Sequence, residues 1–406
     1  MSELIQPKDE SELAAAIAEA NETATPLEVI GAGTKRGIGK PLQTAATLST
    51  DMMNGVTLYE PNELFISAQA GTPLVEIQKT LAKNNQQLAF EPTDLGPMLG
   101  EKPDKGTIGA VFAANQSGSR RIQVGAARDH FIGMRAVNGR GEIFKSGGRV
   151  MKNVTGYDLC RGLAGSWGTL AVMSEVTMKV LPMTESTCTL LYTGLTDDVA
   201  VDAMCAALGT PFDVSGTVHL HADFSRAMLD SDMLRRPVTV TALRLENFKT
   251  SLDYRSKQLT GALAAYGKPV ILDDAASKGF WASMQCLTFL QGSDDPVWRI
   301  STAPTQGAKL VSALTRRLEC KAAYDWSGGL IWLQTSPSAD AGAAEVRRVV
   351  AEIGGHATLI RADQSVRSSV DVFQPLAPAV DQLTRKLKQS FDPAGILSPG
   401  RMYSRI

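Results

Sequence analysis

Glycines between residues 106 and 182 constrain this chain more than any other feature. They stand at positions 106, 109, 118, 125, 133, 139, 141, 147, 148, 156, 162, 165 and 168. This density exceeds what side-chain packing requires, because each glycine trades stability for close backbone approach or a positive φ. An apolar helical turn at 106–114 and a hairpin at Asn138-Gly139 are predicted in the same stretch. The pattern indicates backbone wrapped around a large ligand.

A second glycine-rich turn follows a short apolar strand that we predict at residues 26–30. The turn reads Gly31-Ala32-Gly33-Thr34-Lys35-Arg36-Gly37. Glycines there present backbone N–H groups that no Cβ obstructs, which suits a pyrophosphate. A Rossmann turn of this kind opens a helix, whereas Ile38-Gly39-Lys40-Pro41 does not form one easily. The alternative interpretation is a tight surface turn with two basic residues.

Residues 26–182 resemble the FAD-binding domain of the vanillyl-alcohol-oxidase and p-cresol-methylhydroxylase (PCMH) superfamily. More narrowly, 151–181 and 392–403 are similar to the family of FAD-binding subunits of bacterial glycolate oxidase, and shorter similarities occur at 325–329 and 354–358. The resemblance implies an α+β fold with two domains. These are a PCMH-type FAD-binding domain at 1–183, with lobes at about 1–95 and 106–183, and an α+β cap at 184–362 with a mainly antiparallel sheet. A linker, a helix and a C-terminal tail that returns to the flavin site would occupy 363–406.

The resemblance also implies FAD as the cofactor. Some members bind it covalently through a histidine in the pyrophosphate loop, but no histidine lies between residues 1 and 129, so we expect non-covalent FAD. The implied FAD-binding residues are Gly31, Ala32, Gly33, Thr34, Lys35, Arg36, Pro92, Thr93, Gly106, Thr107, Ile108, Gly109, Ser117, Gly118, Lys152, Glu175, Val176 and Arg401. For Lys152 the alternative is a solvated surface lysine, and for the neighbouring Tyr157 a packing aromatic.

Outside the glycine-rich region, periodicity predicts alternating strands and helices. A helix is expected at 9–21, with Asp9 or Ser11 as its cap, and another at 377–391. The polar stretch 363–371 is predicted to be a mobile linker. The predicted cap strands are 188–194, 212–221, 238–245, 268–273, 297–302, 324–334 and 356–361, and the predicted cap helices are 197–208, 249–265, 305–318 and 340–353.

Candidate catalytic residues are few. His356 is the better placed histidine for a general base, since its short glycine-flanked motif is similar to one in the glycolate oxidase family. Arg401 or Arg361 would bind a substrate carboxylate. Related D-2-hydroxyacid dehydrogenases have a histidine-rich metal segment in the cap, and the counterpart here, 323–332, contains no histidine. His219 and His221 are spaced to share one strand face, but no third ligand is apparent, so no metal is expected.

Composition excludes several function classes. The net charge of −1 and the absence of basic runs longer than two residues argue against nucleic-acid binding. The five cysteines form no CxxC pair, and no segment has about 18 consecutive apolar residues, the length of a membrane span. We therefore expect a cytoplasmic protein with no membrane span of its own, which reaches a membrane, if at all, through partner subunits.

Three functional interpretations remain open at this point. The first is an FAD-binding subunit of a heteromeric glycolate oxidase, working with a catalytic flavoprotein subunit and an iron–sulfur subunit to oxidise glycolate or a similar 2-hydroxyacid. The second is a self-sufficient FAD-dependent 2-hydroxyacid dehydrogenase. The third is a non-catalytic FAD-binding subunit needed for assembly.

Overall fold

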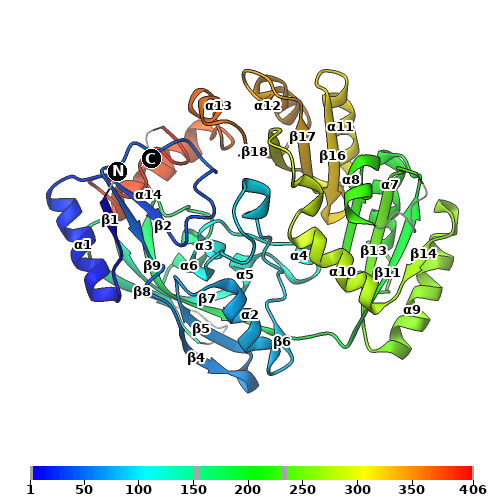
Figure 1. Cartoon of the computed structure of the whole chain (residues 1–406), viewed down its shortest axis with the longest axis horizontal. Helices are drawn as coiled ribbons and strands as arrows, with labels where there is room; N and C mark the ends of the chain where they lie inside the picture. Colours follow the sequence, from blue (N-terminus) through cyan, green and yellow to red (C-terminus); the bar gives the residue numbers. More distant parts are fainter. Residues whose placement is uncertain (1–2, 150–155, 230–235, 405–406) are drawn as a thin grey trace. The chain divides into compact units, whose positions relative to one another are not determined.

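The computed structural model describes residues 3–149, 156–229 and 236–404 (Figure 1). Its contacts divide the chain into two compact units. The first unit consists of Met1–Ser117, Gly125–Met183 and Pro375–Ile406, and the second of Gly118–Val124 and Thr184–Gln374. The expected domain limits differ at two places, because 118–124 and 363–374 belong to the second unit.

The first unit begins with a small parallel sheet in the order β1-β3-β2. Its strands are β1 (Glu3–Ile5), β3 (Ala46–Ser49) and β2 (Leu27–Ile30). Helix α1 (Glu10–Glu22) starts at Asp9, whose side chain accepts a hydrogen bond from the Glu12 amide at 2.8 Å. Leu13 and Ile17 of this helix are fully buried in the core with Leu27 and Leu48. The predicted helix and its Asp9 cap are therefore confirmed.

A five-stranded antiparallel sheet forms the second layer of the first unit. Its order is β4-β5-β9-β7-β8, with β4 (Val56–Glu60), β5 (Phe65–Gln69), β9 (Ala171–Lys179), β7 (Phe131–Asn138) and β8 (Ile143–Gly147). The hairpin predicted at Asn138-Gly139 is the β7–β8 connection. The short strands β6 (Gln86–Gln87) and β10 (Leu181–Pro182) pair separately. The helices here are α2 (Leu74–Ala82), α3 (Ile108–Ala113), α5 (Ala127–His130) and α6 (Leu159–Leu163).

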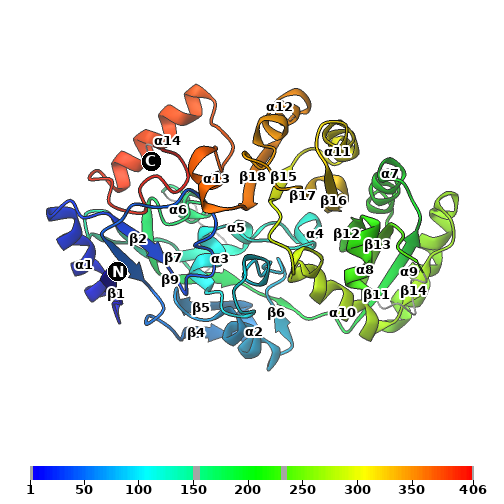
Figure 2. The ribbon, with the colours of Figure 1, turned by 45° about the horizontal axis from the view of Figure 1, so that its top comes forward.

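The C-terminal segment packs against the start of the first unit. Helix α14 (Pro378–Phe391) and the tail after it lie beside β2 in both views (Figures 1 and 2). The Leu27 amide donates to the Ile396 carbonyl at 2.8 Å, and the Val29 amide donates to Ser398 Oγ at 3.0 Å. Because β2 leads directly into Gly31, the tail supports the base of the glycine-rich loop.

The second unit is built on an eight-stranded antiparallel sheet, in the order β14-β11-β13-β12-β16-β17-β15-β18. An antiparallel cap sheet was predicted, and it is confirmed. The strands are β14 (Val270–Leu272), β11 (Ser186–Thr193), β13 (Val240–Asn247), β12 (Gly216–Leu220), β16 (Cys320–Asp325), β17 (Leu330–Thr335), β15 (Val297–Ser301) and β18 (His356–Arg361). The helices are α4 (Arg121–Val124), α7 (Asp197–Leu208), α8 (Ala222–Met228), α9 (Lys249–Ala262), α10 (Asp274–Gln285), α11 (Gly307–Thr315), α12 (Ala343–Ile353) and α13 (Gln364–Ser369).

Two predictions for the second unit are wrong. The single strand expected at 324–334 is two strands, β16 and β17, joined by a 3₁₀ turn at Trp326–Gly328. The turn depends on positive φ angles of 52° at Trp326 and 56° at Ser327. Neither residue type favours positive φ, so the turn could not be predicted from the sequence. The linker expected at 363–371 contains helix α13, in which Val366 is buried. Helices α8 and α10 were not predicted.

The segment 118–124 is held inside the second unit by specific contacts. Ser119 Oγ donates to Asp325 Oδ2 at 2.7 Å, and Trp326 Nε1 donates to the Gly118 carbonyl at 3.0 Å. Arg120 forms a buried ion pair with Glu246. A stretch that interrupts the first unit in sequence is therefore anchored to the second.

Among the described helices, none has the length and apolar character needed to cross a membrane.

Candidate functional site

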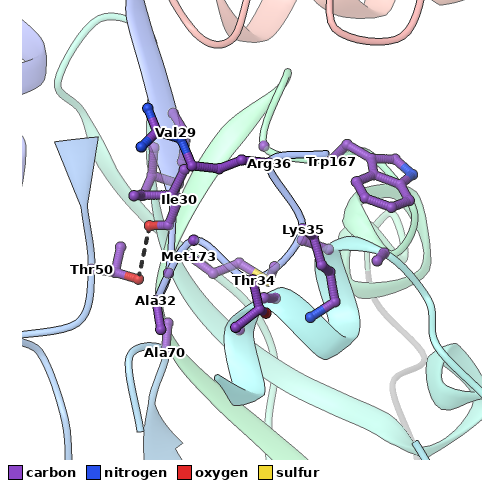
Figure 3. Close-up of a pocket in the computed structure, with 18 of the residues that line it drawn as sticks. Val29, Ile30, Ala32, Thr34, Lys35, Arg36, Thr50, Ala70, Trp167 and Met173 are labelled. Carbon is purple, nitrogen blue, oxygen red and sulfur yellow. Dashed lines mark hydrogen bonds between the residues drawn. The ribbon is translucent and has the colours of Figure 1, made fainter. Parts of the chain in front are cut away.

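The loop after β2 borders a cavity in the first unit (Figure 3). Figure 3 shows Ile30 and Ala32 on one side of the opening and Trp167 on the other. The lining residues are Val29, Ile30, Gly31, Ala32, Gly33, Thr34, Lys35, Arg36, Thr50, Ala70, Gly109, Ala110, Ala113, Ala114, Trp167, Gly168, Ala171, Val172, Met173 and Arg401. The whole predicted loop 31–36 therefore faces one cavity, together with Gly109 and Arg401.

The loop backbone is shaped to donate hydrogen bonds. Gly33 has a φ of 80°, and the Arg36 amide closes the turn on the Gly33 carbonyl at 3.1 Å. Within the described parts of the chain, the amides of Ala32, Gly33, Thr34 and Lys35 have no hydrogen-bond acceptor. Successive amides of this kind form an anion-binding concavity.

Lys35 adds a buried cation to this concavity. Its residue is 9% exposed, and its Nζ lies 3.7 Å from the position that a Cβ on Gly106 would take. Burial lowers the pKa of Lys35 to about 8, with Asp94 opposing the shift and Arg401 adding to it. Arg401 Nη2 donates to the Lys35 carbonyl at 2.9 Å, and its Cζ lies 5.6 Å from the Trp167 ring centroid. Two cations therefore border the loop.

Arg36 differs from Lys35 because an acid already holds it. Its Nε donates to Glu28 Oε1 at 3.0 Å, and its Nη2 contacts Glu28 Oε2. The hydrogen bond to Glu28 raises the pKa of Arg36. Arg36 therefore braces the loop through Glu28, and Lys35 and Arg401 bring further positive charge to it.

Thr107 and Gly31 show how closely the backbone segments approach each other. A Cβ on Gly31 would lie 2.2 Å from Thr107 Oγ1, so the cradle admits only glycine there without a shift. Within the described chain, Thr107 Oγ1 is buried and has no hydrogen-bond partner. An unpaired buried hydroxyl is costly unless a ligand satisfies it. Unpaired amides, a buried lysine and an orphaned hydroxyl together fit the pyrophosphate of FAD.

Other predicted FAD residues lie outside this lining. Thr93 Oγ1 donates to the Ser117 carbonyl at 3.3 Å, and Ser117 Oγ accepts from the Ala127 amide at 2.9 Å, so they bond to the protein itself. Pro92 is buried beside Thr93 in sequence. Gly106, Thr107 and Ile108 lead into α3, one wall of the cavity.

The remaining predicted positions are spread over several elements. Gly118 lies in the second unit, with its carbonyl bonded to Trp326. Glu175 and Val176 lie in β9, opposite Gln69 and Ala68 of β5. Lys152 lies outside the described residues.

Tyr157 and Asp158, which accompany Lys152 in sequence, have separate positions. Tyr157 is 90% exposed, so the alternative of a packing aromatic is wrong. Asp158 caps α6 by accepting from the Arg161 amide at 3.1 Å.

The two predicted catalytic residues belong to different units. His356 is exposed at the start of β18 in the second unit, and Arg401 lines the cavity of the first. Arg361, the alternative carboxylate-binding residue, donates to the carbonyls of Asp295 and Leu290 at 2.7 and 2.6 Å. Its guanidinium therefore serves the structure of the second unit.

His219 and His221 do not share one face. His219 is fully buried, with Nδ1 2.8 Å from Thr241 Oγ1 and Nε2 3.3 Å from Asp197 Oδ1. His221 follows the strand and caps α8, accepting from the Asp223 amide at 3.2 Å. In the parts of the chain that the structure describes, no group of three or more His, Cys, Asp or Glu could hold a metal ion.

Trp167 and Met173 line the cavity but were not among the predicted site residues. Trp167 has a φ of 55°, between Gly165 and Gly168 with φ of 89° and 73°. The motif Gly-Ser-Trp-Gly was the available signal, because a bulky residue enclosed by glycines commonly marks a strained turn. Met173 lies on β9 and carries no local signal that separates it from core residues.

Comparison with known proteins agrees with this geometry. A family described as "FAD binding domain" matches residues 2–147. The chain is 31% identical over 386 residues to glycolate oxidase subunit GlcE of Escherichia coli, and the alignment covers 94% of each chain. The 4-ethylphenol oxidase from Gulosibacter chungangensis superposes with a TM-score of 0.73 at 14% identity, covering 99% of this chain and 89% of that one. The p-cresol methylhydroxylase structure gives 0.71 at 12%, covering 98% and 88%. The predicted PCMH-type fold is confirmed.

Proposed function

We propose that this chain is the FAD-binding subunit of a heteromeric glycolate oxidase, because it belongs to the family of FAD-binding oxidoreductases that includes glycolate oxidase subunit GlcE. Its substrate would be glycolate or a similar 2-hydroxyacid, oxidised to the 2-oxoacid. When bound, FAD supplies the two-electron acceptor for such a CH–OH donor. A catalytic flavoprotein subunit and an iron–sulfur subunit would complete the complex and pass the electrons onward.

One observation carries the proposal, namely the cradle formed by the loop 31–36. Its unpaired amides, the buried Lys35 and the nearby Arg401 offer donors and positive charge to a pyrophosphate. Small residues of α3 and its C-cap (Ala110, Ala113 and Ala114) leave an apolar wall against which flat rings can lie. Among the described residues of the lining, there is no histidine, cysteine or tyrosine that could form a covalent link, which supports non-covalent FAD.

The composition of the lining bears on where the proton acceptor for hydroxyacid oxidation lies. Oxidation of a hydroxyacid needs a group that takes the hydroxyl proton. The lining residues that the structure describes include no Asp, Glu or His, and among them Lys35 alone titrates near neutral pH. We therefore place the proton acceptor outside this cavity, in the second unit or in a partner subunit.

The test is to assay the purified complex with and without this subunit. We expect non-covalent FAD, released by acid precipitation, at one more equivalent per complex when the subunit is present. Glycolate-dependent dye reduction should be lost when it is omitted. Full glycolate activity in a complex that contains the subunit but lacks its flavin would support the assembly-only interpretation, and full activity without the subunit would contradict the proposal. Rapid anaerobic bleaching of the isolated subunit by glycolate would support the self-sufficient enzyme.

Lys35 gives FAD binding a defined pH dependence. A lysine with a pKa of about 8 is mostly charged at pH 7 and mostly neutral at pH 9.5. Since pyrophosphate favours the charged form, we expect FAD affinity to fall as the pH rises above about 8. Lys35→Met should weaken binding about tenfold at pH 7, the rough loss of one charge-assisted contact, and should abolish this pH dependence. Titration of apoprotein with FAD, followed by quenching of flavin fluorescence, measures both.

Lys79 provides the matched control for this variant. It lies on helix α2 and is absent from the cavity lining. Lys79→Met should bind FAD with wild-type affinity and the wild-type pH profile. If Lys35→Met retains the wild-type profile, the falling affinity at high pH has another source and the assignment of Lys35 is wrong.

A further inference from the structure

The second unit holds two arginines against one tryptophan. The Cζ atoms of Arg121 and Arg299 lie 4.2 and 5.2 Å from the centroid of the Trp326 ring. Arg121 comes from α4, Arg299 from β15, and Trp326 from the turn between β16 and β17. A second indole, Trp332 of β17, lies 6.0 Å from the Arg299 Cζ. Three separate elements thus bring two guanidinium groups to one aromatic surface.

Arg299 has no acidic partner in this arrangement. Within residues 3–149, 156–229 and 236–404, no group forms a hydrogen bond or an ion pair with the Arg299 guanidinium. Arg299 and Arg121 are both half-buried. Burial, and after it the charge of Arg121, lower the pKa of Arg299 to about 10, with Asp325 acting in the opposite direction. A partly buried cation beside a second cation is unfavourable unless an anion compensates.

Asp325 is held by other groups. Its Oδ1 accepts from the Trp326 amide and its Oδ2 from Ser119 Oγ, each at 2.7 Å. These bonds fix the carboxylate on the turn and on the segment 118–124.

The turn that presents Trp326 is itself unusual. Trp326 and Ser327 are consecutive non-glycine residues with positive φ, and the Ser327 amide is fixed by Thr217 Oγ1 at 2.9 Å. Trp326 Nε1 is fixed by the Gly118 carbonyl at 3.0 Å. Such backbone persists only where the surroundings impose it, and it concentrates at ligand sites.

We propose that Arg121, Arg299 and Trp326 form a binding site for a small monocarboxylate of the 2-hydroxyacid class. Guanidinium groups bind carboxylates through two parallel hydrogen bonds, and the indoles offer an apolar surface to a short carbon chain. The apolar indoles favour an organic acid over inorganic phosphate. The inference deepens the proposed function, on which it rests for the choice of glycolate as the probe.

The experiment is calorimetric titration of the full FAD-loaded chain with glycolate. We expect glycolate to bind the wild type and its neutral analogue glycolamide not to bind. Arg299→Gln should weaken glycolate binding about tenfold or more, the loss expected for a charge-assisted pair. The matched control is Arg316→Gln, at an exposed arginine of the same unit, which should bind like the wild type. Wild-type affinity in Arg299→Gln would overturn the site.

Three further measurements decide between the possible outcomes. Arg299→Lys retains the charge without the planar fork and should bind glycolate more weakly than the wild type, so unchanged affinity would refute bidentate binding. Inorganic phosphate, titrated in parallel, should bind more weakly than glycolate, and equal binding would overturn the carboxylate assignment.

FAD content should stay at the wild-type level in both Arg299 variants, because the FAD cavity is lined by the first unit. A wild-type chain that holds FAD but binds no glycolate refutes this site alone, and one that holds no FAD refutes the proposed function.

Discussion

Gly33→Val is expected to purify as a folded protein without FAD, with an affinity weaker by about two orders of magnitude or more. Gly33 has a φ of 80°, a region that is strained for any residue with a Cβ and most for a β-branched one. Space alone does not forbid the side chain, since a Cβ would lie 3.5 Å from the nearest atom, Arg36 Cδ. The loss follows because the loop must leave the turn that directs its amides into the cavity. Flavin content by absorbance and FAD titration of the apoprotein measure it.

Gly162→Val is the matched control for this substitution. Gly162 lies in α6 of the same unit and has no positive φ, and a Cβ added there would meet no described atom within 4 Å. This variant should keep wild-type flavin content. Equal flavin content in Gly33→Val and Gly162→Val would show that the loop 31–36 does not bind the pyrophosphate.

The cofactor loop could be predicted from sequence because its signal is local. A strand followed by Gly31-Ala32-Gly33 determines both the turn and its exposed amides, and the structure places all of 31–36 on one cavity. The long cap helix 197–208 was also predicted with its observed limits, since its periodicity and its polar flanks are local features.

Other features depended on contacts between distant residues. The turn at Trp326 requires positive φ at two non-glycine residues, and its indole is fixed by Gly118, 208 positions away. Assignment of 118–124 to the second unit depends on Arg120 and Ser119 finding acids at 246 and 325. No local pattern encodes such pairs, so neither the split strand nor the anchored segment could be derived from sequence.

A buried ion cluster gives the second large prediction, on stability. Glu246 pairs with Arg120, its Oε2 lies 3.4 Å from Arg244 Nε, and all three side chains are at most 6% exposed. Although burial tends to raise the pKa of Glu246, the charges of Arg244 and Arg120 outweigh it and lower the pKa. Glu246→Gln keeps the shape but removes the charge that both guanidiniums share. We expect the free energy of unfolding of the second unit to fall by about 3 kcal/mol, the rough cost of breaking a buried pair, measured by urea unfolding.

The acid dependence and a surface control separate this effect from a general loss of charge. A carboxyl whose folded pKa is lowered stabilises the fold above its unfolded pKa and loses that contribution as pH falls through the folded pKa. The difference between wild type and Glu246→Gln should therefore be full at pH 7 and shrink below about 4.5, the ordinary value for the group. Glu345→Gln removes a half-exposed carboxylate that pairs with Arg317 and Arg348, and should change the unfolding midpoint far less.

Hydrogen exchange should also rise at the amides of 118–124 in Glu246→Gln only, because Arg120 anchors that segment to the second unit. Unchanged exchange there, with an unchanged midpoint, would show that the ion pair does not hold the segment in place.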